Sequence, residues 1–293
     1  MVNPCNLADL GVRAGRVDSE TLLYGESRSI YRGLGYEYID FKPYYYGEDI
    51  RYIDWRVSAR YMTNPYEPNL YMREYISEKQ VETLFIFDLH GSLNYWDKLA
   101  SITYIATLMY SLARKLNDET HTIILHEGET IVIPSTRPEE VIEYLKKTIC
   151  SLREIRGESN LGGIEKIITR YSKIRGFIVF TDYGVKPEYF SKIGWIARAL
   201  NTSTGIIVAT HKYELEAPID TIVTVYSHTG KTVTNSLSII YNEIKKHVNE
   251  CRARITLSTK NYIEAQGLDH ARENKIKTMR LYLNIRSRRY LYP

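Results

Sequence analysis

The chain reads Val81-Glu-Thr-Leu-Phe-Ile-Phe-Asp88-Leu-His-Gly-Ser92, a short apolar run that ends in an acid and a small loop. Apolar residues then recur from Trp96 to Leu116 at positions 96, 99, 102, 106, 109, 113 and 116, which is the spacing of one helix face. A buried strand followed by an amphipathic helix is typical of a β-α-β unit. The stretch therefore predicts the first strand and first crossover helix of an α/β domain.

The same alternation continues on the carboxyl side of this stretch. Gly176-Phe-Ile-Val-Phe-Thr-Asp182 is a second apolar run that ends in an acid. Strands and helices that alternate at this spacing favour a mainly parallel sheet with helices on both faces. The other predicted strands are 121–125, 130–133, 205–210 and 221–225, and the predicted helices are 96–116, one beginning at Pro138, 161–171, 187–200 and 236–251.

The two flanks differ from this central part. Residues 1–80 are rich in Tyr, Arg and Gly with little helical period, and alternating pieces such as 35–41 predict a smaller β-rich region. We therefore divide the chain into a β-rich region at 1–80, an α/β domain at 81–250 and a basic segment at 251–293. No fold is predicted for the last segment, whose basic residues include Lys275, Lys277, Arg280, Arg286, Arg288 and Arg289.

Composition sets limits on function and location. A net charge of +4 is too small by itself to indicate nucleic-acid binding. The three cysteines are far apart and odd in number, and no CxxC pair occurs, which argues against a disulfide scaffold and fits a reducing interior. The sequence shows neither a secretory signal nor an apolar run of about 18 residues. We expect a soluble cytoplasmic protein without a membrane span, and frequent Tyr, Ile, Arg and Glu are compatible with a thermophilic source.

Polar side chains follow the two strands that end in acids. Ligands of open α/β sheets bind at the carboxyl ends of the strands, so Asp88, Ser92 and Asp182 are expected at one edge. Ser159 lies in a Gly-rich loop directly before a predicted helix and joins them. Two carboxylates and two hydroxyls form a hard-oxygen site suited to Mg²⁺. The alternative is that both aspartates cap turns and helix starts.

A longer motif lies upstream of these residues. The segment Tyr46-Gly-Glu-Asp-Ile-Arg-Tyr-Ile-Asp-Trp-Arg-Val-Ser-Ala-Arg60 resembles the signature of the DUF58 family. Its lead-in at 33–38 and the triplet Arg73-Glu-Tyr75 also resemble that family. The resemblance runs from about residue 15 to about residue 250. It implies a Rossmann-like domain of the von Willebrand A type.

The resemblance also implies a metal-ion-dependent adhesion site. The first loop of such a site reads Asp-x-Ser-x-Ser, and Asp88 and Ser92 match its first and last positions. Ser159 stands where a second loop supplies a Thr, and Asp182 matches the Asp of a third loop. In an occupied site of this type a carboxylate from the partner completes the coordination. Mg²⁺ or another divalent cation, bound weakly or not at all, is the implied cofactor.

His90 departs from this pattern, because it occupies the position of the first Ser. An imidazole is a softer ligand than a hydroxyl and suits Zn²⁺, Ni²⁺ or Mn²⁺ better than Mg²⁺. Three states are therefore open. The site is empty with His90 bonded to Asp182, or it holds a different metal, or it binds Mg²⁺ weakly with His90 turned away. We favour the first.

The signature segment has a physical interpretation of its own. Its charges alternate and an aromatic side chain lies among them, so the segment forms either a structural network of charge-assisted hydrogen bonds or a partner surface. We favour the structural network, because so many charges in one turn-rich segment need partners. The residues concerned are Asp49, Arg51, Asp54, Trp55, Ser58 and Arg60.

Three functions compete on these observations. The resemblance implies a non-catalytic interaction module, because DUF58 proteins are associated with MoxR-type AAA+ ATPases. The chain itself has no GxxxxGK[ST] motif, so no bound nucleotide is expected. One alternative is a metal-dependent phosphohydrolase or nuclease that uses Asp88 and Asp182, but a two-metal site needs more carboxylates. The other is nucleic-acid binding through the basic segment, although a solvated face or a tail packed on the domain explains it better.

Overall fold

The computed structural model describes residues 3–24, 40–45, 50, 53–60, 70–74, 80–133, 137–152, 154–171, 173–216, 222–226 and 232–287. Contacts divide the chain into two compact units. One unit comprises residues 1–21 and 80–293, and the other comprises residues 22–79. The larger unit holds the candidate site and is described first.

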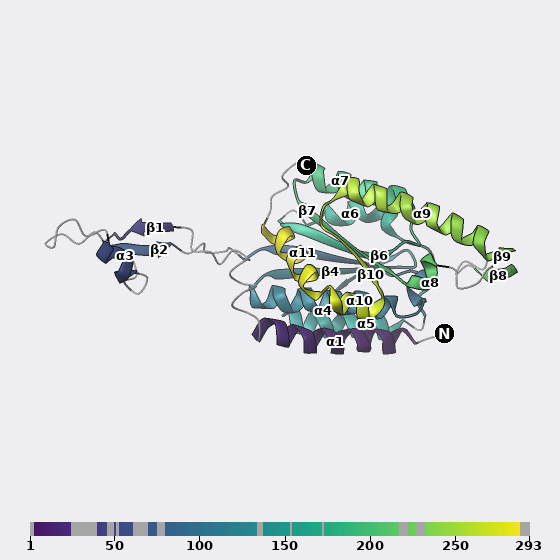
Figure 1. Ribbon diagram of the computed structural model, residues 1–293, viewed down its shortest axis with the longest axis horizontal. Helices are drawn as coiled ribbons and strands as arrows, with labels where there is room; N and C mark the ends of the chain where they lie inside the picture. Colours follow the sequence, from purple (N-terminus) through teal and green to yellow (C-terminus); the bar gives the residue numbers. More distant parts are fainter. Residues whose placement is uncertain are drawn as a thin grey trace. The chain divides into compact units, whose positions relative to one another are not determined.

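A six-stranded sheet forms the centre of the larger unit (Figure 1). Its order is β10-β7-β6-β3-β4-β5, and every pair is parallel except β4 with β5. Taken in chain order, this is the 3-2-1-4-5-6 arrangement of a doubly wound Rossmann-type sheet. The predicted mainly parallel α/β fold is confirmed. The strands are β3 (Glu82–Asp88), β4 (Glu119–His126), β5 (Glu129–Ile133), β6 (Gly176–Asp182), β7 (Ser203–Thr210) and β10 (Tyr262–Gln266).

Helices cover both faces of this sheet (Figure 1). One face carries α6 (Ile164–Ile168), α7 (Pro187–Ala199) and α9 (Leu237–Ser258). The opposite face carries α4 (Lys98–Lys115), with α1, α5, α10 and α11 around it. Their bounds are Pro4–Tyr24, Pro138–Ser151, Gly267–Glu273 and Lys275–Ser287. The short elements are η2 (Gly91–Asn94), η3 (Leu161–Gly163) and α8 (Lys212–Leu215), and a hairpin pairs β8 (Ile222–Tyr226) with β9 (Thr232–Ser236).

Strand β3 shows why its sequence is almost continuously apolar. Alternate residues of a strand point to opposite faces, and both faces of this sheet are covered. Leu84 and Ile86 enter the core beneath α6, α7 and α9. Phe85 points to the other face, where its ring stacks on Tyr110 of α4 at 4.5 Å between centroids. Burial on both sides fixes the strand, and thereby the position of the acid at its end.

The carboxyl-terminal segment belongs to the same domain, so the expected boundary at residue 250 is wrong. It would cut helix α9, and β10 beyond it is an edge strand paired with β7. Helix α11 packs against α4 and the sheet, with Tyr282 fully buried. Arg286 is 5% exposed and donates to Asp118 Oδ2 at 2.7 Å. Within the described residues, this part of the basic segment packs back on the domain.

The amino-terminal residues also depart from expectation, because 4–24 form a helix rather than strands. Helix α1 lies close against α4. A Cβ at Gly11 would lie 2.1 Å from Thr103 Oγ1 and 2.2 Å from the Ala100 carbonyl oxygen. Asp18 accepts hydrogen bonds from Tyr104 of α4 at 2.8 Å and from Arg272 of α10 at 3.0 Å. The helix is therefore part of the α/β domain.

A disulfide joins Cys5 of α1 to Cys150 of α5, with 4.3 Å between the Cα atoms. This corrects the expectation that the cysteines form no disulfide. The two residues are 145 positions apart in the chain, so sequence spacing gave no signal of their pairing. Cys251 is buried and free. Among the described helices, none is long and apolar enough to cross a membrane.

The smaller unit, residues 22–79, contains an antiparallel strand pair and one helix in its described parts. Strand β1 (Asp40–Pro43) pairs with β2 (Tyr71–Glu74), and a bridge joins Ile53 to Met72. Helix α3 (Trp55–Arg60) follows the bridge. In the described part of residues 1–80, strands occur only in this unit, and the predicted β-rich region does not extend to the helix at 4–24.

The disulfide generates a first prediction. Cys150→Ser should lower the free energy of unfolding by about 2–4 kcal/mol, because the cross-link restricts the unfolded chain. That corresponds to a fall in Tm of roughly 5–15 °C, measured by calorimetry. Reductant should lower the Tm of the natural chain to a similar degree and leave that of the variant unchanged. An unchanged Tm in the variant would contradict the stabilising role of the bond.

The contact between α1 and α4 leads to a second prediction. Gly11→Ala should destabilise the protein by about 1–3 kcal/mol, because the added methyl group overlaps backbone and side-chain atoms of α4. Gly163→Ala is the matched control, since a Cβ there would meet no atom within 4 Å. Urea denaturation of both variants measures the difference. Equal midpoints for the two variants would show that α1 does not pack as described.

Candidate functional site

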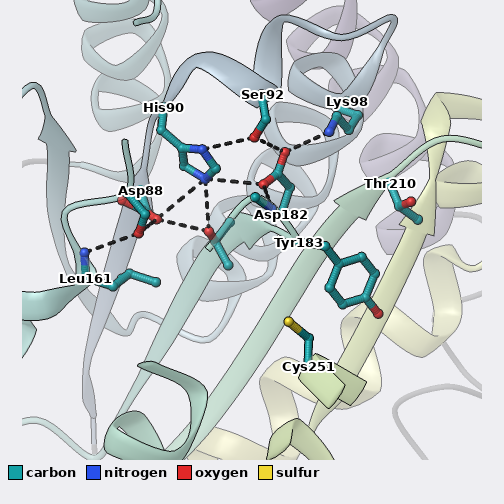
Figure 2. A network of polar contacts seen from close by, with 12 residues as sticks. Asp88, His90, Ser92, Lys98, Leu161, Asp182, Tyr183, Thr210 and Cys251 are labelled. Atoms are coloured by element: carbon teal, nitrogen blue, oxygen red, sulfur yellow. Dashed lines mark hydrogen bonds and ion pairs between the residues drawn. The ribbon is translucent and has the colours of Figure 1, made fainter. Parts of the chain in front are cut away.

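The five predicted positions come together at the carboxyl ends of two paired strands. Figure 2 shows four of them, namely Asp88, His90, Ser92 and Asp182. Asp88 is the last residue of β3 and Asp182 the last residue of β6. His90 and Ser92 lie in the loop after β3, and Ser159 lies in the loop before η3. Asp88, His90 and Asp182 are completely buried. The parallel pairing of β3 with β6 is what places two acids from distant parts of the chain side by side.

Asp88 is held by donors from the chain itself. Its Oδ2 accepts from Ser159 Oγ at 2.6 Å and from Thr181 Oγ1 at 3.0 Å, and its Oδ1 accepts from the Asn160 backbone N–H at 3.0 Å. Burial raises the pKa of Asp88 above its usual value, although His90 and these hydrogen bonds oppose the increase. Both oxygens of Asp88 are therefore already engaged.

Asp182 is held in the same way and also meets a cation. Ser92 Oγ donates to its Oδ2 at 2.5 Å, and the Gly184 backbone N–H donates to its Oδ1 at 2.6 Å. Lys98 Nζ donates to Oδ2 at 2.7 Å. Burial alone would raise the pKa of Asp182, but the charges of Lys98 and His90 outweigh it and hold the pKa well below its usual range.

The His90 ring lies between the two aspartates (Figure 2). Its Nε2 is 3.3 Å from Asp182 Oδ1 and 3.6 Å from Asp88 Oδ2. Its Nδ1 is 3.0 Å from Ser92 Oγ, and the single hydrogen of that hydroxyl is donated to Asp182. Nδ1 is therefore a donor to Ser92. The His90 ring therefore contacts Asp182 through Nε2, which is the side-chain contact of the first of the three states, and the occupancy of the site stays a prediction.

Sequence reasoning missed Lys98 and Glu214. Lys98 begins α4 and its side chain is 2% exposed, with Nζ also donating to Glu214 Oε1 at 2.5 Å. Burial by itself would lower the pKa of Lys98, but Asp182 and Glu214 reverse the effect and raise it. Lys98 is the first residue of α4, and Glu214 lies in α8 directly after β7. Both residues therefore lie at the edge of the sheet where the aspartates were expected. That position is the signal that would have found them.

Glu214 ties a third loop to the site. It lies in α8, directly after β7, and its Oε2 accepts from the His211 backbone N–H at 3.0 Å and from Thr210 Oγ1 at 3.2 Å. Burial raises the pKa of Glu214, with Lys98 opposing the increase. The loops after β3, β6 and β7 thus meet at one ammonium group.

The residues present do not fit a divalent cation. Such an ion needs oxygen atoms with free lone pairs directed at one point. At this site the Asp88 and Asp182 oxygens accept hydrogen bonds from hydroxyls, backbone N–H groups and Lys98. Among the residues that the structure describes, no group of three or more His, Cys, Asp or Glu side chains is arranged to hold a metal.

Aromatic rings lie beside Lys98 of this site. We give the name aromatic rim to the exposed Tyr95, Trp96 and Tyr213 together with the half-buried His211. The Trp96 and His211 rings stack 4.9 Å apart at an interplanar angle of 2°. Trp96 is 52% exposed and has a φ of 54°, a left-handed conformation that is rare for a bulky residue. The Tyr95 ring centroid lies 5.8 Å from Lys98 Nζ, so the rim is adjacent to the ion pairs.

The signature residues lie elsewhere, in the smaller unit. Asp54 Oδ1 accepts from the backbone N–H groups of Arg56 and Val57 at 3.0 and 3.1 Å, and so caps helix α3. Ser58 Oγ accepts from the Tyr71 backbone N–H at 2.9 Å, which joins α3 to β2. Trp55 and Arg60 are exposed. Asp49 and Arg51 lie outside the described residues, so the predicted charge network is described only in part.

Comparison with known proteins gives two partial structural similarities and one family match. Two solved structures from Bacteroides are similar in part. The conserved hypothetical protein BatB of Bacteroides thetaiotaomicron has a TM-score of 0.44 and 16% identity, over 70% of this chain and 99% of that one. An aerotolerance-related membrane protein of Bacteroides fragilis, carrying mutations to serine, has a TM-score of 0.39 and 14% identity, over 70% and 98%.

No curated protein matches the sequence. A family model described as "Protein of unknown function DUF58" matches residues 40–232. That match covers the signature segment, all five positions of the candidate site and more than half of the 293 residues. The protein therefore belongs to the DUF58 family.

Proposed function

We propose that this protein is a non-catalytic interaction module whose partner is a MoxR-type AAA+ ATPase. One observation supports the proposal, namely the aromatic rim beside carboxylates that are already paired with Lys98 of the same chain. Tryptophan and tyrosine are the side chains most often found at the energetic centre of protein interfaces. The choice of ATPase rests on the association of DUF58 proteins with that class.

The site supports binding better than catalysis. A phosphohydrolase or nuclease that used Asp88 and Asp182 would need carboxylate oxygens open to a metal or a substrate. Both side chains are fully buried and accept hydrogen bonds from neighbouring residues. Among the described residues of the site, the two carboxylates are therefore not free to act as a general base, and the half-buried Ser92 and Ser159 hydroxyls already donate to them.

The basic segment gives little support to nucleic-acid binding. Arg286 is paired with Asp118, and Leu281, Tyr282 and Ile285 of the same helix are buried. A segment that binds nucleic acid presents its cations to the phosphates. We regard α11 as a structural helix of the domain, in which Lys275, Lys277 and Arg280 form its solvated side.

We further propose that the protein acts in the cytoplasm of a thermophile. A disulfide is uncommon in the cytosol of mesophiles, but intracellular proteins of hyperthermophiles are rich in disulfides. The Cys5–Cys150 bond is therefore compatible with a cytoplasmic location if the source is a thermophile. The amino-acid composition is compatible with such a source. Fractionation of the source cells tests the location, and thiol labelling of the cytoplasmic pool tests whether Cys5 and Cys150 are oxidised there.

The partner proposal is tested with two tryptophans of similar exposure. Trp96→Ala removes the centre of the aromatic rim and should weaken binding to the MoxR-type ATPase at least tenfold, as expected for an interface hot spot. Trp195→Ala is the matched control, because Trp195 is 55% exposed on α7 and is not part of the rim. Its affinity should stay within about twofold of the natural chain. Titration calorimetry with the ATPase in its ATP-, ADP- and nucleotide-free states gives the affinities.

Two results would contradict the proposal. One is the absence of binding by the natural chain in all three nucleotide states. The other is an equal loss of affinity in Trp96→Ala and Trp195→Ala, which would place the interface away from the rim. Circular dichroism of both variants checks that each remains folded.

A further inference from the structure

We propose that Lys98 is a built-in cation that takes the place of the divalent metal ion in this site. This is the same site that the proposed interaction function uses. Only the role of the site depends on that function. The carboxylates at the sheet edge are neutralised by a side chain of the same chain, and the site forms without metal.

The position of the ammonium group is the first argument. Nζ lies between Asp182 Oδ2 at 2.7 Å and Glu214 Oε1 at 2.5 Å, and the side chain is almost completely buried. An ammonium removed from water is costly unless acidic partners surround it. Here two carboxylates from two different loops provide them. Lys98 therefore bridges acidic groups from separate loops, which is what a bound cation does.

His90 provides the second argument, because it fills the space between the aspartates. A metal ion held by both Asp88 and Asp182 would need a position within bonding distance of both carboxylates. The Nε2 atom of His90 lies 3.6 Å from Asp88 Oδ2 and 3.3 Å from Asp182 Oδ1. Thr181, Ser159 and the Asn160 backbone meanwhile occupy three of the roughly four lone-pair sites of the Asp88 carboxylate. A metal ion would therefore have to displace both His90 and Lys98.

Close packing around the site is the third argument. A Cβ at Gly184 would lie 2.5 Å from Ser92 Oγ, 3.0 Å from Asp182 Oδ1 and 3.1 Å from the His90 ring. The glycine lets the loop after β6 lie directly against these three side chains. Their donors and acceptors already satisfy one another. The compact geometry fits a finished hydrogen-bonded network better than a site awaiting a hydrated ion.

The test measures Mn²⁺ binding by the full-length chain. The loss of the electron paramagnetic resonance signal of free Mn²⁺ reports binding, and Tm is measured with Mn²⁺ and with EDTA. The natural chain should bind no stoichiometric Mn²⁺ at 1 mM or below, about the weakest affinity expected of a specific site. EDTA should leave its Tm unchanged.

Removing the built-in cation should create a metal site. Lys98→Ala leaves Asp182 and Glu214 facing each other, so its Tm in EDTA should fall by roughly 10 °C. Mn²⁺ should bind to this variant at one ion per chain and restore part of the loss. The double variant His90→Ser, Lys98→Ala should bind Mn²⁺ at least tenfold more tightly than Lys98→Ala, because it regains the Asp-x-Ser-x-Ser loop. Lys192→Ala removes a half-buried lysine, 35% exposed and paired with Glu165, and should gain no binding.

Several outcomes would overturn the proposal. One is stoichiometric Mn²⁺ binding by the natural chain that is lost on Asp182→Asn. Another is a folded double variant that gains no Mn²⁺. A Lys98→Ala variant that stays unfolded both with and without Mn²⁺ also counts against it, because the metal then fails to replace the ammonium. None of these measurements involves the partner, so failure here and failure of the interaction proposal are distinguishable.

Discussion

The buried ammonium of Lys98 is the interaction on which the carboxyl edge of the sheet depends. Two acidic groups lie close together in a part of the molecule with little water, and their mutual repulsion would open the loops that carry them. The ammonium removes that repulsion and joins three loops that are remote in sequence. Because Lys98 is the first residue of α4, the position of the site is fixed to the central helix of the fold.

This dependence also works in the opposite direction. Helix α4 is buried along most of its length between the sheet and the helices around it, so its register cannot shift without disturbing the core. Its first residue is therefore held at a fixed point relative to β6 and β7. A metal ion exchanges with solvent, and the occupancy of its site depends on the metal concentration. The ammonium group of a lysine is covalently attached and is always present. The arrangement favours a permanently assembled surface rather than one assembled on demand.

The sequence was informative wherever a local pattern determined the structure. The apolar runs before Asp88 and Asp182 predicted two strands of one sheet, and parallel pairing then placed both acids, Ser92 and Ser159 together. It was uninformative wherever a contact depended on tertiary packing. Lys98 and Glu214 are 116 residues apart, and nothing in either neighbourhood marks the other as its partner. Helix α1 escaped detection because glycines at its contact with α4 weaken the apolar period.

The disulfide between α1 and α5 has a consequence for the integrity of the chain. Residues 6–149 form a covalently closed loop, and the whole of the unit at 22–79 is inserted in it. A protease that cuts once anywhere in this loop produces a nicked molecule whose two pieces stay linked. The inserted unit is thus tethered to the α/β domain through both of its ends, and only two cuts, or one cut with reduction, can release a fragment.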